Sequence, residues 1–177
     1  MKRSAFVTIF FLFTVFPFSL AGQNTRRNYL TTEATISYNY LEDVKVHFLF
    51  TYKIKRHNPF IGLEFPVNSA PVSNFGFNAG YKFFPNKNRQ TFDLFFIYII
   101  EGCSRKMYYN STITGFSLHN LIGYGFNVNF NDNLYLTHHI AAGIENSWFG
   151  ESGGFSDFSL VINLGIGIKI KTLKNGK

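Results

Sequence analysis

The sequence predicts an all-β protein, an eight-stranded antiparallel up-and-down transmembrane β-barrel. Three observations indicate this fold class. Apolar and polar residues alternate along most of the chain; aromatic residues make up 19% of it and charged residues only 15%, against about 25% charged in soluble domains; and short turns alternate with longer connections. A length of 177 residues fits one domain.

Residues 1–21 are expected to be a cleaved signal peptide, which leaves 22–177 as an outer-membrane β-barrel domain. Lys2 and Arg3 precede an apolar run from Ala5 to Leu20, and Ser19 and Ala21 are small residues suited to cleavage before Gly22. An uncleaved anchor is the alternative, but this run is shorter than the span of about 20 residues that a membrane helix needs. Loss of the two basic residues lowers the net charge from +7 to +5.

The alternation predicts eight strands. The first two show the two-residue period, the third is short and lies between Pro59 and Pro66, and the fifth is apolar on both faces. The sixth is the clearest, because its even positions are mostly apolar and its odd positions mostly Gly, Ser, His and Asn. The predicted strands are 31–40, 44–56, 60–66, 74–84, 91–102, 115–130, 134–147 and 156–171.

The connections suggest how the barrel is oriented. Tight turns are predicted at Arg56–Pro59, Pro85–Asn88 and Asn131–Asn133, and longer loops at Cys103–Thr114 and Trp148–Ser156. Outer-membrane barrels have short periplasmic turns and longer outer loops, so both chain ends are expected on the periplasmic side.

The polar face is expected to line the lumen, and the apolar face to meet lipid. A soluble, lipocalin-like carrier is the alternative, but its exterior would need to be rich in Lys, Glu and Asp, whereas the polar face here is mostly Gly, Asn, Ser, Thr and His. Small polar residues suit the narrow interior of eight strands. Aromatic residues near the strand ends could form interfacial girdles: Tyr38, Tyr40, Phe83, Phe116, Phe130, Tyr135 and Trp148.

The leader, the eight segments and two stretches, Ile122–Phe126 and Asn131–Leu136, resemble the small outer-membrane β-barrel proteins of Bacteroidetes-type bacteria, which are related in architecture to the OmpA and OmpX barrels. The resemblance covers the mature chain and is one of pattern. It implies a monomer in the bacterial outer membrane, with membrane lipid, lipopolysaccharide and the barrel-insertion machinery as partners. No nucleic-acid partner is expected, because the chain has no basic run with interleaved aromatics.

The register of two strands places one ionisable pair. With a turn at Asn131–Asn133, Glu145 lies opposite His119, close enough for contact across the lumen. A structural pair that braces the interior is the favoured interpretation. The catalytic alternative is a lipid-modifying hydrolase, similar to lipid A deacylases of the PagL type. Its His-x-Ser-Asn signature is absent here, and Ser117 would face the lumen with the pair, away from an acyl substrate.

No cofactor or metal site is predicted. His138 and His139 are neighbours on one strand, so their side chains point to opposite faces and cannot share an ion. Gly123-x-Gly125 and Gly165-x-Gly167 fall inside strands and open no helix, unlike nucleotide-binding fingerprints. Cys103 is the single cysteine and cannot form an internal disulfide.

Charged residues are expected at the inner face or its rims: Lys45, Lys53, Lys55, Lys82, Lys169 and Lys171, with Asp93, Glu101 and Glu145. A porin-like, weakly anion-preferring pore is one interpretation, and a lumen plugged by ion pairs is the favoured one. Outer contacts are expected from Lys106, Tyr108, Tyr109 and Trp148. The predicted function is therefore a structural or surface-interaction role without catalysis.

Overall fold

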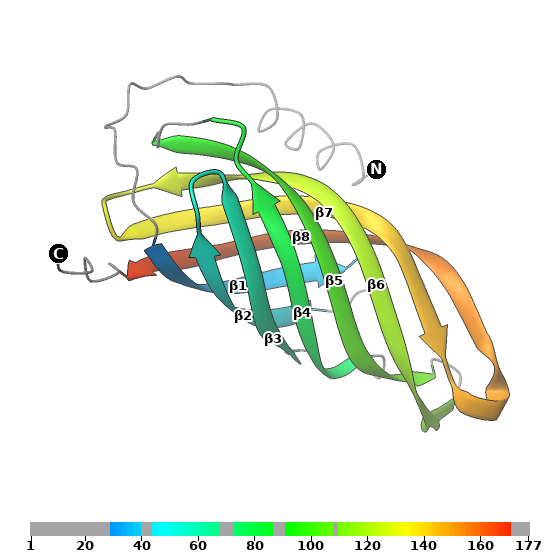
Figure 1. The fold of residues 1–177 in the computed structure, drawn as a ribbon. Helices are drawn as coiled ribbons and strands as arrows, with labels where there is room; N and C mark the ends of the chain where they lie inside the picture. Colours follow the sequence, from blue (N-terminus) through cyan, green and yellow to red (C-terminus); the bar gives the residue numbers. More distant parts are fainter. Residues whose placement is uncertain (1–28, 40–43, 68–72, 87–90, 108–109, 171–177) are drawn as a thin grey trace, which may run out of the picture.

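A computed structural model describes residues 29–39, 44–67, 73–86, 91–107 and 110–170. These residues form eight antiparallel strands and one short 3₁₀ helix (Figure 1). The strands close into a barrel in sequence order, which confirms the predicted fold class. The strands are β1 (Tyr29–Asn39), β2 (Val44–Lys53), β3 (His57–Pro66), β4 (Ser73–Phe83), β5 (Phe92–Met107), β6 (Asn110–Asn129), β7 (Leu134–Trp148) and β8 (Gly154–Ile170), with η1 (Gly150–Ser152) before β8. The described residues include no helix that is both long enough and apolar enough to span a membrane.

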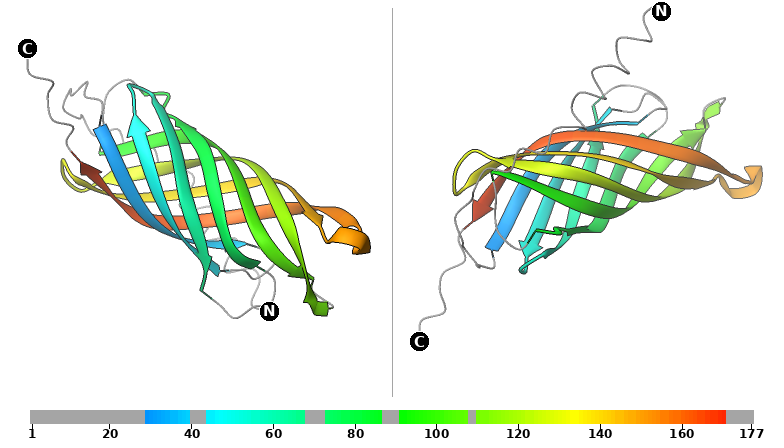
Figure 2. Two further views of the ribbon diagram at one scale, coloured as in Figure 1. Left: turned by 60° about the horizontal axis from the view of Figure 1, so that its bottom comes forward. Right: turned by 90° about the horizontal axis from the view of Figure 1, so that it is seen from above.

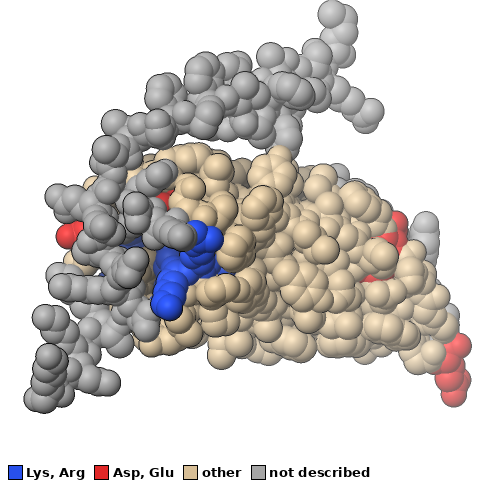
Figure 3. All heavy atoms as spheres, turned by 45° about the horizontal axis from the view of Figure 1, so that its top comes forward, with Lys and Arg blue, Asp and Glu red and all other residues tan. Residues whose placement is uncertain are grey.

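The polarity of the two faces of the barrel wall is the reverse of that in a soluble protein. In β1, Thr31, Glu33 and Thr35 are buried, whereas Ile36 is 57% exposed. The same alternation runs through β6, where Ile122 is 71% exposed. Side chains alternate between the faces of a strand, so polar groups fill the lumen and apolar groups cover the outside. Uncharged residues form a broad band over the visible face, with charged residues toward its ends (Figure 3).

The sheet closes where the first strand meets the last. β1 pairs with β8 in an antiparallel ladder from Leu30↔Ile170 to Asn39↔Val161. The closed wall is evident from two further directions (Figure 2). Closure leaves no unpaired sheet edge, which is the condition for a sheet to lie in hydrocarbon. We call the end with the short turns, where β1 begins and β8 ends, the turn end, and the opposite end the loop end.

The barrel wall is taller on one side than on the other. The strands from β5 to β8 continue past the loop-end limits of β1 to β4, and their hairpins project from the barrel in Figure 1. The predicted loop at Cys103–Thr114 was therefore wrong: Cys103–Met107 belongs to β5, and β6 begins at Asn110. Lys106 pairs with Thr114, so backbone pairing between the two strands extends through a segment whose sequence shows no clear alternation.

The turn between β2 and β3 lies earlier than predicted. Ile54 and His57 exchange two backbone hydrogen bonds, of 2.7 and 2.9 Å, around Lys55 and Arg56. Lys55 has a φ of 56°, a left-handed conformation that costs a side-chain-bearing residue about 1–2 kcal/mol. Pro59 lies inside β3, but the ladder between β2 and β3 ends at Phe60, one residue away. The missing amide hydrogen of Pro59 therefore leaves no gap in that ladder.

Two inward-facing glycines give room to aromatic rings on the neighbouring strand. Gly167 lies opposite Tyr135, and a Cβ on this glycine would lie 2.1 Å from the tyrosine ring. Gly80 lies opposite Phe60 in the same way, with the ring 2.4 Å from the position of a Cβ. Tyr135 is 2% exposed inside the lumen, so its predicted place in an interfacial girdle was wrong.

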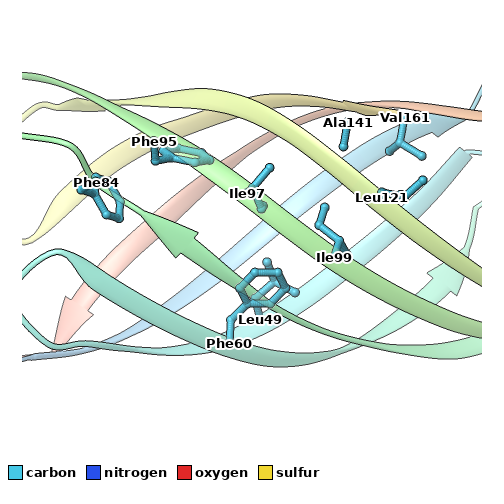
Figure 4. Packing of buried hydrophobic residues seen from close by; sticks show 9 residues of the cluster. All are labelled: Leu49, Phe60, Phe84, Phe95, Ile97, Ile99, Leu121, Ala141 and Val161. Atoms are coloured by element: carbon cyan, nitrogen blue, oxygen red, sulfur yellow. The ribbon is translucent and has the colours of Figure 1, made fainter. Parts of the chain in front are cut away.

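Apolar side chains fill the middle of the lumen and reach toward the turn end. They come from six of the eight strands and from the residue after β4 (Figure 4). We call this set the apolar layer: Leu49, Phe60, Phe84, Phe95, Ile97, Ile99, Leu121, Ala141 and Val161. Phe84 and Phe95 pack with their ring centroids 5.4 Å apart. Buried charged side chains lie on both sides of this set, toward the turn end and toward the loop end.

Candidate functional site

The charged side chains inside the barrel are the candidate functional site, because a buried charge needs specific partners. Toward the turn end, the buried charged residues are Glu33, Lys82, Asp93 and Lys169, which we call the turn-end layer. Toward the loop end, they are Lys45, Glu64, Glu101, Arg105 and Glu145, which we call the loop-end layer. Nothing else among the described residues is both charged and buried.

In the turn-end layer, Lys82 is fully buried and neutralises Glu33. Its Nζ donates to Glu33 Oε1 at 2.8 Å and to Oε2 at 2.7 Å. The hydroxyl of Tyr135 donates a third hydrogen bond to Oε1, at 2.8 Å. The ammonium also lies over the ring of Phe95, 5.0 Å from the centroid. Charge and hydrogen-bonding capacity are thus both satisfied at Glu33.

The other charges of the turn end are also paired. Lys169 Nζ donates to Asn129 Oδ1, and Asn129 Nδ2 donates to Asp93 Oδ2 at 3.2 Å. The half-buried Lys53 places its ammonium 3.7 Å from the ring centroid of Phe84. With two buried cations and two buried carboxylates, the turn-end layer is balanced.

In the loop-end layer, one pair comes from β2 and β3. Lys45 Nζ donates to Glu64 Oε1 at 2.9 Å, and Lys45 Nζ lies 4.0 Å from Cys103 Sγ. Glu64 is the register partner of His47, and Glu64 Oε2 lies 3.8 Å from His47 Nδ1. All of these side chains point into the barrel from the wall that β2 to β5 form.

A second pair lies on the taller side of the wall. Arg105 of β5 forms an ion pair with Glu145 of β7, and Ser147 Oγ donates to the same oxygen, Glu145 Oε1, at 2.8 Å. His119 Nε2 lies 3.8 Å from Glu145 Oε2, and His119 Nδ1 lies 3.2 Å from Ser159 Oγ. The guanidinium of Arg105 bridges the space between strands that are not neighbours.

The loop-end layer carries one carboxylate more than it has cations. Lys45 and Arg105 face three carboxylates, and the third carboxylate is that of Glu101. Glu101 is 4% exposed, and its carboxylate makes no hydrogen bond or salt bridge to a described residue. An ionised carboxylate without a partner is costly in a low-dielectric interior, so this layer needs a proton or a bound cation.

The predicted pair of His119 and Glu145 is found in register, with both side chains buried. Of the four residues predicted to make outer contacts, the structure describes two. Both lie on strands: Lys106 near the end of β5, and Trp148 as the last residue of β7. Trp148 stacks on Phe116, with ring planes 16° apart. Their placement in loops was therefore wrong. Tyr108, Tyr109 and the leader 1–21 lie outside the described residues.

The predicted inner lysines divide into two groups. Lys45, Lys82 and Lys169 are buried in the lumen, whereas Lys53 is half-buried at the end of β2 and Lys55 is exposed in the turn that follows. Lys171 lies outside the described residues. The predicted inner acids Asp93, Glu101 and Glu145 are all buried.

A lipid-modifying hydrolase would need a serine and a histidine on the outer wall. Among the described residues, His57 and His138 are the histidines that face outward. His57 Nδ1 is hydrogen-bonded to Tyr81, and the ring of His138 packs 5.2 Å from the ring of Phe126. No hydrogen bond between an outward histidine and a serine is found in the described part of the chain.

Besides Arg105, which was predicted to lie in a loop, sequence reasoning missed Glu33, His47 and Glu64 of the interior networks. Each occupies the polar position of an alternating segment, and that signal would have placed them in the lumen. The partners of His47 and Glu64 could not be named, because the pairing of β2 with β3 depends on the exact position of the turn between them. Glu33 is held by Lys82 and Tyr135, which lie on strands that do not neighbour β1.

Comparison with known proteins identifies a fold and no family. No protein-family model matches the chain, and no curated protein sequence does either. The N-terminal β-barrel domain of Pseudomonas aeruginosa OprF matches with a TM-score of 0.54 at 13% identity, over 81% of this chain and 100% of that domain. Neisserial surface protein A matches with a TM-score of 0.50 at 13% identity, over 82% and 97%. The chain therefore has the fold of the small outer-membrane β-barrels.

Proposed function

We propose that the chain is an integral, monomeric protein of the bacterial outer membrane with a structural or surface-interaction role and no catalysis. The observation that carries the proposal is the inverted polarity of the wall, with polar side chains inside and large apolar side chains outside. Water would not stabilise such an exterior, whereas hydrocarbon requires it. The fold shared with outer-membrane barrels supports the same location.

The taller side of the wall supports a role at the cell surface. In this orientation, the hairpins β5–β6 and β7–β8 extend beyond the rest of the rim. Phe155 on their inward face is 46% exposed and lies 5.8 Å from the guanidinium of Arg105. Lys106 and Trp148 belong to the same extension, and we propose that it makes the outer contacts expected from the sequence.

The alternatives are less well supported. A soluble carrier would have an apolar cavity and a charged surface, which is the opposite arrangement. A lipid-modifying hydrolase would place its catalytic serine and histidine side by side on the lipid-facing wall, where the described outward histidines contact aromatic rings instead.

The test is membrane fractionation combined with electrophoresis of unboiled and boiled samples in SDS. We expect the chain in the outer-membrane fraction, with faster migration before boiling, because a closed barrel resists SDS until it is heated. A protein that stays in the soluble periplasmic fraction and does not change its migration would contradict the proposal.

A further inference from the structure

Three buried side chains from three different strands converge in the loop-end layer. They are His47 of β2, Glu64 of β3 and Glu101 of β5, and one ligand-type atom of each lies within 4.8 Å of those of the other two. None is more than 4% exposed. One imidazole and two carboxylates form a set that binds first-row divalent cations in proteins.

We propose that His47, Glu64 and Glu101 form a binding site for a divalent transition-metal cation inside the barrel. The charges of the loop-end layer support this site. Because Glu101 is buried without a hydrogen bond or salt bridge to a described residue, and because its layer has an excess carboxylate, a cation at this point would supply the missing partner.

The orientation of His47 also supports the site. Its Nε2 lies 2.5 Å from Ser37 Oγ, and its Nδ1 lies 2.8 Å from Asn78 Nδ2. An amide nitrogen only donates, so Nδ1 carries the lone pair and Nε2 carries the hydrogen that Ser37 accepts. The unprotonated nitrogen is therefore the one that lies 3.8 Å from Glu64 Oε2, and a cation bound there takes the place of the Asn78 amide hydrogen. In metal sites the ring nitrogen away from the ion commonly donates to an acceptor that fixes the ring, and Ser37 Oγ is that acceptor here.

A glycine in the wall gives Glu64 room at this site. Gly76 lies between Glu64 and Cys103 in the register of the wall, and a Cβ on this glycine would lie 2.5 Å from Glu64 Oε1. The absence of a side chain at Gly76 lets the carboxylate of Glu64 lie against the wall and reach toward Glu101. Ligand atoms around Zn²⁺ sit about 2.0–2.2 Å from the ion. The three side chains must therefore draw together by about an ångström, which side-chain rotation allows.

Lys45 is the competitor for this site. Its ammonium holds Glu64 Oε1 at 2.9 Å, and it repels a second cation at the same carboxylate. We therefore expect the metal to displace this ammonium from Glu64. A variant without the charge, Lys45→Met, is expected to bind the cation more tightly.

The test uses the full chain without an affinity tag, folded in detergent, treated with a chelator and dialysed against Zn²⁺ alone. We expect about one Zn²⁺ per chain, measured by mass spectrometry of the metal. With Co²⁺ as the probe, we expect visible absorption bands of a nitrogen- and oxygen-ligated ion. Glu101→Gln and His47→Gln are expected to lose this stoichiometric binding, and Ser37→Ala to weaken it about tenfold.

His139→Asn is the matched control. His139 is also a buried, inward-facing histidine, but it lies outside the trio, so its replacement should leave metal binding unchanged. Each variant must still change its migration on boiling, which shows that its barrel is closed. The proposal is overturned if the folded wild-type chain binds no Zn²⁺, if folded Glu101→Gln binds as much as the wild type, or if Lys45→Met does not tighten binding.

Discussion

Lys82 shows how a single residue can stabilise the packing of several side chains in the lumen. Its side chain is 0% exposed, and it forms the salt bridge to Glu33 from across the barrel. Tyr135 holds the same carboxylate from a third strand, and the ring of Tyr135 can approach only because residue 167 is glycine. The packing of Glu33, Tyr135 and Gly167 therefore depends on the ammonium group of Lys82.

We predict that Lys82→Met destabilises the folded barrel by about 3–5 kcal/mol, because it leaves the Glu33 carboxylate buried without its cation. The measurement is urea unfolding in lipid vesicles, followed by tryptophan fluorescence. The double variant Glu33→Gln/Lys82→Met is the control and should recover a large part of the loss, since no unpaired charge remains. Equal instability of the single and double variants would contradict the explanation.

At the scale of single residues, the sequence could identify only those pairs that lie on two strands joined by a clearly predicted turn. His119 and Glu145 could be placed opposite each other because the turn at Asn131–Asn133 is unambiguous: Asn131 Oδ1 accepts hydrogen bonds from the amides of Asn133 and Leu134, at 2.8 and 2.7 Å. The trio of His47, Glu64 and Glu101 could not be placed. Moving the β2–β3 turn from Arg56–Pro59 to Lys55–Arg56 changes which residue of β3 lies opposite each residue of β2.

The strands themselves were easier to locate than to delimit. Alternation marks the part of a strand that separates lipid from lumen, since only there must every second side chain be apolar. The segment Cys103–Met107 lies beyond that part. It is strand because it pairs with β6, and backbone pairing leaves no periodic signal in the sequence.

On the lipid-facing side of β6, depth in the membrane should set the cost of a charge. Ile122 lies halfway along the strand and is 71% exposed, whereas Phe130, 60% exposed, follows its turn end. We predict that Ile122→Arg destabilises the barrel by about 2–4 kcal/mol and that Phe130→Arg costs about 0–1 kcal/mol. Folding titrations into vesicles measure both values. Similar costs at the two positions would contradict a bilayer centred on Ile122.

In the whole molecule, apolar and charged side chains together fill the lumen. Leu121 and Ile97 of the apolar layer are 0% and 2% exposed, and Lys82 and Glu64 of the charged layers are 0% exposed as well. We predict that the purified barrel shows no steady conductance in planar bilayers, because ions would have to cross this packed interior without water. Steady, anion-selective channels would contradict this prediction and favour the porin-like interpretation of the inner lysines.

The pairing of β1 with β8 has a consequence for how the molecule forms. Every other ladder joins strands that are consecutive in the chain, so a hairpin can zip up locally as soon as its two strands exist. The ladder from Leu30↔Ile170 to Asn39↔Val161 instead joins segments that are almost the whole described chain apart, and contacts of such high sequence separation form slowly. Until β8 arrives, the sheet has two open edges that hydrocarbon does not tolerate. Folding and entry into the membrane are therefore expected to finish together, when the last strand reaches the first.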